Sequence, residues 1–376
     1  MKFGIGVLGA TGYIGTPYRR EIRESPLDAR IVALHGRRRD LLEAAGKEDQ
    51  AQLVTDDWRQ VVDHPEVNLI VVCTPDAYHR EAVMRCAALG KHLICEKPIG
   101  ANAKEAKEMW DAVRKTGAGH YVPFWTRYVP VCVRAREIVR QGILGQIRAA
   151  VYRWHNPRPS HMPFTWRDDT TISSAGIVAD VGSHAYDTLC WMLETEATRV
   201  MSHAKIMSPA KPDVGEINLA EAISWGQSGL QSRVSQNRPV TAFDYGSIAF
   251  ELNAGIVGLL LVSNSPFLRK GLAPEIELHG SDASLAVDRI RSTVTLFQPG
   301  DATGDVEFVT DPGPVNRFSQ YVFPSLRNRI AGQITEHPGM DDGYRAQLFT
   351  DAAAQSACAG TWIVISPNTL DKQHPP

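Results

Sequence analysis

The stretch GVLGATGYIG, residues 6–15, decides the fold because it joins a strand-like run to a helical one through closely spaced glycines. The apolar run Phe3–Leu8 predicts a buried strand, and Gly9, Gly12 and Gly15 predict a tight turn into a helix. Such a turn lets backbone N–H groups approach a dinucleotide pyrophosphate. The usual G-x-G-x-x-G spacing would place the first glycine one residue later, so a turn without a ligand stays open.

The spacing of this turn is similar to the loop of short-chain dehydrogenases, which use a Tyr-x-x-x-Lys pair as their base. The chain has 10 tyrosines, and none is followed by a lysine four positions later. That class of dehydrogenase is therefore disfavoured.

Composition indicates an ordinary globular protein. The chain has 376 residues, 43% hydrophobic and 22% charged, with a net charge of −2, so two domains are expected and a nucleic-acid partner is not. Its 6 cysteines form no C-x-x-C pair and most lie in apolar runs, which favours a reducing compartment over a disulfide framework; we expect no metal. We see no secretory signal and no apolar run of membrane-spanning length, so we expect a cytoplasmic protein without a membrane partner.

The pattern of strands and helices changes near Pro123. Before it, strand-like runs alternate with helical segments, which predicts an α/β Rossmann domain over residues 1–123. After it come a helix at about 127–141, a long strand-like run, a helix at 183–193, several β-like runs and a last helix at 341–360. This predicts an α+β domain over residues 124–376 with a mostly antiparallel sheet.

The segment after the second predicted strand bears on the cofactor. An Asp or Glu normally stands there and accepts from the 2′-hydroxyl of NAD. Here Arg37, Arg38 and Arg39 follow instead. Arginine binds a 2′-phosphate bidentately, so the sequence favours NADP over NAD, with a solvated helix start as the alternative.

Two short motifs carry groups suited to proton transfer. CEKPIG, residues 95–100, follows a predicted strand, so Lys97 would lie where α/β sheets bind ligands. In AGIVADVGSHAYDTL, Asp180 and His184 are four apart, on one face if helical, and a carboxylate beside an imidazole supports a general base. Taken alone, Lys97 also fits a surface lysine, and Asp180 fits a helix cap beside a structural histidine.

Taken together, the glycine turn, the strand-end lysine and the Asp/His helix are the parts of a hydride-transfer enzyme. The chain resembles the glucose–fructose oxidoreductase and inositol dehydrogenase family, Gfo/Idh/MocA. The resemblance rests on GVLGATGYIG, VVCTPDAYH, CEKPIG and AGIVADVGSHAYD, in the family's order. Two features depart from the family pattern, namely the extra residue in the turn and the missing acid after the second strand.

The resemblance implies a Rossmann domain followed by a large open antiparallel sheet, whose outer face often makes the oligomer contact. We accordingly expect a homodimer or homotetramer formed through that sheet. The resemblance also implies that Lys97, Asp180 and His184 form the catalytic group. The predicted cofactor-binding residues are Gly9, Ala10, Thr11, Gly12, Tyr13, Ile14, Arg37, Arg38, Thr74, Pro75, His79, Glu96 and Lys97.

The predicted reaction is reversible oxidation of a secondary alcohol on a sugar, glycoside or cyclitol. His184 would take the hydroxyl proton, and Lys97 would stabilise the oxygen. The predicted substrate-binding residues, chosen as flat aromatics and hydrogen-bonding groups, are Trp125, Arg127, His155, Arg158, Trp166, Arg167, Asp180 and His184. The alternatives are a dihydrodiol- or biliverdin-reductase-like member of the family and a non-catalytic NAD(P)-sensing regulatory protein.

Overall fold

The computed structural model describes residues 2–228 and 236–365, which fold as two compact units. The first unit holds the residues up to Pro123 together with Glu216–Ala222 and Gly313–Arg345. The second holds the other described residues from Phe124 onward. The division at 123/124 expected from the sequence does not anticipate the two later segments that return to the first unit.

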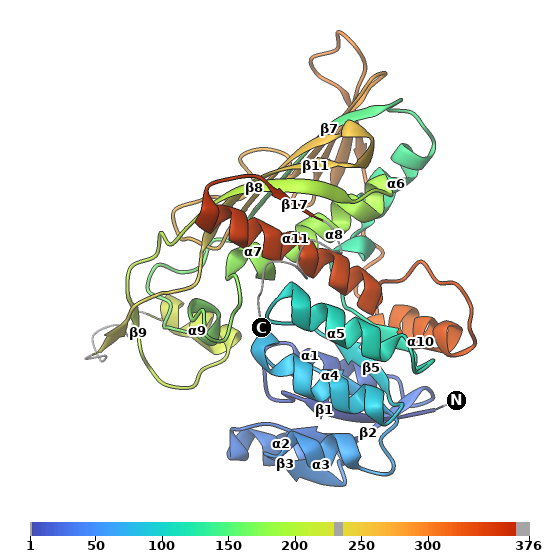
Figure 1. Ribbon diagram of the computed structural model, residues 1–376, viewed down its shortest axis with the longest axis vertical. Coiled ribbons are helices and arrows are strands. Elements are labelled where there is room, and N and C mark those ends of the chain that lie inside the picture. Colours follow the sequence, from blue (N-terminus) through green and yellow to red (C-terminus); the bar gives the residue numbers. More distant parts are fainter. Residues whose placement is uncertain (1, 229–235, 366–376) are drawn as a thin grey trace. The chain divides into compact units, whose positions relative to one another are not determined.

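The first unit is built on a six-stranded sheet in the order β3-β2-β1-β4-β5-β6 (Figure 1). All neighbouring strands are parallel, which is the Rossmann arrangement that the sequence predicts. The strands are β1 (Phe3–Leu8), β2 (Ala29–His35), β3 (Leu53–Thr55), β4 (Leu69–Val72), β5 (His92–Cys95) and β6 (His120–Tyr121). The strand order reverses between β1 and β4, so ligands are expected beyond their carboxyl ends.

Helices cross over between these strands, and α4 and α5 lie side by side (Figure 1). Asn102 caps α5, because its side chain accepts a hydrogen bond from the Glu105 N–H at 3.0 Å. The helical elements of this part are α1 (Gly15–Arg23), α2 (Arg39–Asp49), α3 (Trp58–Asp63), η1 (Asp76–Tyr78), α4 (His79–Ala88) and α5 (Ala103–Val113).

The returning segment Gly313–Arg345 adds a π-helical turn, η6 (Phe318–Val322), and α10 (Phe323–Ile330) to the first unit. The Phe318 ring lies 5.1 Å from that of Tyr18 on α1, and the Phe323 ring stacks 5.5 Å from that of Phe3 on β1. Burying these rings closes one side of the Rossmann core with residues about 300 positions away in the chain.

The second unit carries a nine-stranded sheet in the order β16-β15-β14-β13-β7-β12-β11-β8-β17. Its neighbours are antiparallel except for the parallel pair β7 and β12, so the predicted mostly antiparallel sheet is confirmed. Its strands are β7 (Ile147–His155), β8 (Ala197–Lys205), β11 (Tyr245–Leu252), β12 (Val257–Ser263), β13 (Ile276–Gly280), β14 (Ser284–Asp288), β15 (Thr293–Phe297), β16 (Asp305–Phe308) and β17 (Ile363–Val364). A separate two-stranded ribbon joins β9 (Lys211–Pro212) to β10 (Asn237–Arg238).

Helices α6, α7 and α8 pack on this sheet. The helix predicted at about 127–141 begins at Pro130, because a residue before proline disfavours helical backbone, and Trp125–Tyr128 forms a separate turn, η2. The helical elements of the second unit are η2, α6 (Pro130–Arg140), η3 (Trp166–Asp168), α7 (Ile177–Asp180), α8 (Gly182–Leu193) and η5 (Asn253–Gly255). Two further helices, α9 (Leu219–Gln227) and α11 (Met340–Ala359), carry residues of both units.

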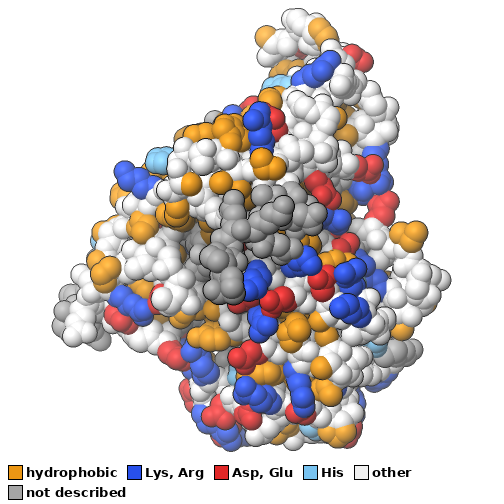
Figure 2. Space-filling view, in the orientation of Figure 1, with side chains coloured by type: hydrophobic (Ala, Val, Ile, Leu, Met, Phe, Trp, Pro, Cys, Tyr) orange, Lys and Arg blue, Asp and Glu red, His pale blue; other side chains and the backbone are white. Residues whose placement is uncertain are grey.

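Basic and acidic side chains are interspersed over the face shown in Figure 2. This distribution matches the net charge of −2 and differs from the one-signed surface that binds nucleic acids.

Candidate active site

The glycine turn follows β1 and is fixed by β2 and β4. The N–H groups of Gly9 and Ala10 donate to the His35 carbonyl at 3.1 and 2.9 Å. Gly9 has a φ of +78°, and a Cβ there would lie 2.7 Å from the Cys73 carbonyl oxygen. A Cβ at Gly15 would lie 2.3 Å from the Gly9 carbonyl oxygen. Both positions therefore require glycine, which explains the spacing seen in the sequence.

The start of α1 suits the pyrophosphate of a dinucleotide. The helix has 9 residues, its N-cap is Ile14 without a side-chain cap, and its first turn holds no acidic residue. Helix N-terminal N–H groups that lack a side-chain cap attract anions. The residues present here therefore fit a nicotinamide dinucleotide, with Gly12 and Gly15 allowing its close approach.

Two of the three arginines after β2, Arg37 and Arg38, each pair with a glutamate of the returning segment Glu216–Ala222, whereas Arg39 pairs with Glu43 on α2. Arg38 donates from Nη1 and Nη2 to the two carboxylate oxygens of Glu221 at 2.9 and 2.8 Å. Arg37 lies 3.2 Å from Glu216. Hydrogen bonds from Arg38 hold the pKa of Glu221 below its usual range. The charge that favoured NADP in the sequence is thus compensated within the same unit.

His79 connects two loops at the carboxyl edge of the sheet. It is buried, its Nε2 lies 2.7 Å from the Thr74 carbonyl, and its Nδ1 lies 3.3 Å from the Ile99 carbonyl. Burial lowers the pKa of His79, which favours the neutral ring. His79 therefore holds together the loop with Thr74 and Pro75, after β4, and the loop after β5.

Glu96 and Lys97 follow β5, next to β4 in the sheet. Glu96 is buried, accepts from the Tyr18 hydroxyl, and accepts from the Lys97 N–H at 3.2 Å. Burial raises the pKa of Glu96. Lys97 is half-buried, and its peptide bond to Pro98 is cis. The backbone of the predicted catalytic lysine is thus anchored by its buried neighbour.

In the second unit, Asp180 ends α7 and His184 lies in the first turn of α8. Val181 between them keeps helical backbone, with φ −93° and ψ −35°, so the two residues remain about one turn apart, as predicted. The Arg167 Nε lies 3.6 Å from the Asp180 carboxylate. The Arg167 guanidinium therefore balances the charge of Asp180. It also places Arg167, a predicted substrate residue, beside one of the predicted catalytic residues.

Aromatic rings surround His184. The Phe124 ring lies 5.8 Å away, edge to face, and the Trp154 ring lies 5.8 Å away with an interplanar angle of 32°. Both residues were absent from the sequence-based site. Because successive side chains of a strand point to opposite faces, Trp154 and His155 cannot both face His184. The sequence-based site included His155, and the structure shows that Trp154 is the residue on the side of His184.

Arg127 has a different environment from the one its predicted substrate role implies. Its Nε and Nη2 donate to the Asp187 carboxylate at 2.8 and 2.5 Å, and the two side chains are only 8% and 3% exposed. This buried pair ties η2 to α8, so the geometry favours a structural role for Arg127.

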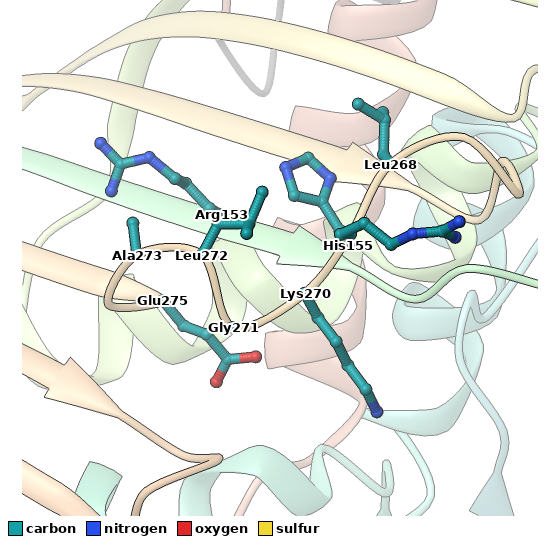
Figure 3. A pocket seen from close by; sticks show the side chains of 9 residues that line it. Arg153, His155, Leu268, Lys270, Gly271, Leu272, Ala273 and Glu275 are labelled. Atoms are coloured by element: carbon teal, nitrogen blue, oxygen red, sulfur yellow. The ribbon is translucent and has the colours of Figure 1, made fainter.

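His155 lines a cavity of about 210 Å³ (Figure 3). In Figure 3 the side chains of Lys270 and Glu275 point away from the His155 ring, so the lining does not converge on one ligand. Since Trp154 accompanies His184, His155 does not share its side of β7. We therefore leave His155 out of the proposed substrate site.

The remaining predicted substrate residues lie in the short turns η2 and η3 and in the loop after β7, all in the second unit. The Arg167 guanidinium stacks 4.2 Å from the centre of the Trp166 ring. The rings of Trp125 and Tyr128 are 6.2 Å apart. The Arg158 N–H donates to the Asn264 carbonyl at 3.0 Å, which fixes that loop beside the end of β12. All three predicted residues, Trp125, Arg158 and Trp166, are half-buried.

Within residues 2–228 and 236–365, no cluster of three or more His, Cys, Asp or Glu side chains is arranged to hold a metal ion. None of the helices in this part of the chain is both long and apolar enough to cross a membrane.

Comparison with known proteins identifies relatives over most of the chain. Residues 3–124 match the model of an oxidoreductase family with an NAD-binding Rossmann fold, and residues 132–286 match the GFO/IDH/MocA C-terminal domain. The levoglucosan dehydrogenase of Pseudarthrobacter phenanthrenivorans is 24% identical over 82% of this chain and 83% of its own. The inositol 2-dehydrogenase of Rhizobium meliloti is 24% identical over 97% of this chain and 100% of its own.

The fold is also shared with a solved levoglucosan dehydrogenase in complex with NADH and levoglucosan. The TM-score is 0.78 at 20% sequence identity, covering 97% of this chain and 100% of that one. With both domain models matched in order, the chain belongs to the GFO/IDH/MocA family of oxidoreductases.

Proposed function

We propose that this protein is a nicotinamide-dependent dehydrogenase that oxidises a secondary alcohol carbon of a sugar, glycoside or cyclitol. The observation that carries the proposal is the set Lys97, Asp180 and His184 in a chain whose glycine turn opens onto an uncapped helix N-terminus. The names of the relatives support the substrate class, since they are dehydrogenases of levoglucosan and inositol. The cofactor is NAD(H) or NADP(H). Arg37 and Arg38 favour NADP in the sequence, but in the structure they are paired with Glu216 and Glu221.

When bound, the cofactor supplies the hydride transfer. His184 takes the proton of the substrate hydroxyl in oxidation and returns it in reduction. Lys97 donates a hydrogen bond to the same oxygen and stabilises its developing negative charge. Asp180, balanced by Arg167 at 3.6 Å, orients the imidazole and offsets its positive charge.

The surroundings of His184 support a ring-shaped polyol as substrate. Phe124 and Trp154 flank the imidazole, and Trp166 with Arg167 offers a flat face and donors nearby in the chain. Aromatic faces suit the C–H face of a sugar ring, while arginine and carboxylate groups suit its hydroxyls.

The test is an absorbance assay at the nicotinamide band with purified enzyme, NAD or NADP, and a panel of sugars, anhydrosugars, inositols and one trans-dihydrodiol. We expect turnover with at least one ring polyol. His184→Ala and Lys97→Ala should each lower kcat by about 10²- to 10⁴-fold. Matched controls are His203→Ala and Lys115→Ala, both exposed, which should leave kcat unchanged.

The outcomes separate the alternatives. Turnover restricted to the trans-dihydrodiol would support the dihydrodiol-reductase-like function instead. Tight dinucleotide binding without turnover of any substrate would support the sensor. Near wild-type kcat in a correctly folded His184→Ala protein would refute the assigned base.

We also propose that the chain forms a homodimer or homotetramer through the sheet of the second unit. On β7 and β12, four of the residues that alternate with buried ones are apolar and only half-buried, namely Ala149, Val151, Leu259 and Leu261. Apolar surface on an open sheet is stabilised by burial against another copy. Light scattering on the purified chain tests this, and a monomer at micromolar concentration would contradict it.

A further inference from the structure

The segment directly after β2 contains no acidic residue before Asp40, but Glu221 brings a carboxylate to Arg38 in that segment. Rossmann folds that bind NAD usually carry an Asp or Glu there, which accepts from the ribose 2′-hydroxyl. In this chain the strand ends at His35 and leads into Arg37 and Arg38. The carboxylate comes instead from a residue 183 positions further along the chain, within the same unit.

The position of Glu221 is built into the local fold. The Asn218 N–H donates to Glu221 at 2.8 Å, and the Glu221 N–H donates to the Asn218 side chain at 3.0 Å. This reciprocal pair is a capping box at the start of α9. Glu221 is therefore held both by its own helix end and by the Arg38 fork.

The fork uses the donors that a 2′-phosphate would need. Arg38 binds phosphate and carboxylate through the same planar pair of N–H groups, and both terminal nitrogens already donate to Glu221. A phosphate arriving here must displace Glu221 or lie against its negative charge. A 2′-hydroxyl carries no charge, so it is not repelled by Glu221 and does not need to displace it from Arg38.

Glu216 adds a second negative charge to the same edge. It lies 3.2 Å from Arg37, but both side chains are largely exposed, at 55% and 64%. Water and salt screen such a pair, so we assign the main effect to Glu221, whose partner is better shielded.

We propose that Glu221 sets the cofactor preference of this protein to NAD over NADP, by occupying Arg38 and placing a negative charge beside the adenosine ribose. The proposal rests on the proposed function and names the determinant of its cofactor. It also accounts for how a chain with three arginines after β2 can carry an NAD-binding Rossmann domain.

The experiment measures Kd for NAD and NADP by titrating the apoprotein without substrate, using tryptophan fluorescence and calorimetry. We expect the wild type to bind NAD more tightly than NADP. Glu221→Gln keeps the capping box, because glutamine serves at that position, but removes the charge. It should tighten NADP binding by roughly tenfold and change NAD binding by less than about threefold.

Three further measurements assign the effect to the Arg38 site. In Arg38→Gln/Glu221→Gln the gain in NADP affinity should disappear. Glu66→Gln removes an equal charge just before β4, at the amino edge of the same sheet, and should leave the ratio of the two Kd values unchanged. The gain in Glu221→Gln should shrink as ionic strength rises.

An unchanged Kd ratio in Glu221→Gln, or tighter binding of NADP than NAD by the wild type, overturns this proposal while leaving the proposed dehydrogenase intact. Failure of the wild type to bind either dinucleotide overturns both.

Discussion

Two arginine–carboxylate forks, one in each unit, share their chemistry but differ in exposure. Arg127 donates to Asp187 at 2.8 and 2.5 Å, and their side chains are 8% and 3% exposed. Arg38 donates to Glu221 at 2.9 and 2.8 Å, and theirs are 25% and 39% exposed. Both arginines were expected, from the sequence, to bind a ligand.

The difference in burial indicates which fork stabilises the fold and which is accessible to a ligand. Removing one partner of a buried fork leaves a charge that water cannot solvate, so such a pair has to remain intact. A half-exposed fork contributes little to folding, and its members stay accessible to a ligand. We therefore assign Arg127 and Asp187 to the support of α8, the helix of His184, and Arg38 and Glu221 to cofactor choice.

The largest expected effect tests the buried side of this comparison. Asp187→Asn removes the carboxylate to which both Nε and Nη2 of the buried Arg127 donate, so the second unit should lose about 3–5 kcal/mol of stability. Urea unfolding followed by tryptophan fluorescence measures the loss as a lower midpoint.

The matched control replaces both members of the pair. Arg127→Met/Asp187→Leu removes the charges and fills the volume with apolar groups, so it should recover most of the lost stability. A loss below about 1 kcal/mol in Asp187→Asn would show that the buried fork does not support the fold.

The buried imidazole of His120 in the first unit makes the stability of that unit depend on pH. His120 accepts from the Met340 N–H at 3.1 Å through Nδ1, and burial, with a contribution from Arg329, lowers its pKa from 6.5 to about 3. The unfolded chain then binds a proton below pH 6.5 that the folded chain does not. Stability therefore falls as pH drops below 6.5, by about 2 kcal/mol at pH 5.

His120→Gln keeps an acceptor for Met340 and removes the titrating group. The unfolding midpoint of this variant should fall less between pH 7.5 and 5 than that of the wild type. Equal pH dependence in both proteins would contradict the burial argument for His120.

Local patterns of apolar and turn residues in the sequence predicted the helices and strands near the site. Contacts between residues far apart in the chain were not predicted. The strand predicted at Phe3–Leu8 and the strand predicted before CEKPIG are confirmed as β1 and β5, since each depends on neighbours within a few residues. The packing of Phe318 and Phe323 on the Rossmann core joins residues about 300 positions apart. No periodicity in either segment indicates that partner.

The same distinction applies to the site. The spacing of Asp180 and His184 placed them one helical turn apart. Alternation along β7 puts Trp154 and His155 on opposite faces, but only the structure shows that Trp154 is the one beside His184. The pairings Arg127–Asp187 and Arg38–Glu221 span 60 and 183 residues. A sequence shows that an arginine is charged but not which carboxylate it pairs with. Arg127 and Arg38 were therefore both predicted to bind ligands.

The smallest expected effect tests the exposed side of the comparison. Arg38→Gln should change the stability of the first unit by less than about 1 kcal/mol, because the fork is partly solvated and screened. The same unfolding measurement applies. A loss comparable to that of Asp187→Asn would contradict the division between the two forks.

The pH dependence of this fork has a definite sign. Arg38 lowers the pKa of Glu221, so any stability from the pair is present above the ordinary glutamate pKa and is lost as pH falls through the lower folded value. Arg38→Gln should thus differ from the wild type slightly at pH 7 and not at all once Glu221 is protonated. Its effect on dinucleotide affinity should exceed its effect on folding, because we propose that the fork lies beside the adenosine ribose, and because it is partly exposed and contributes little to the core.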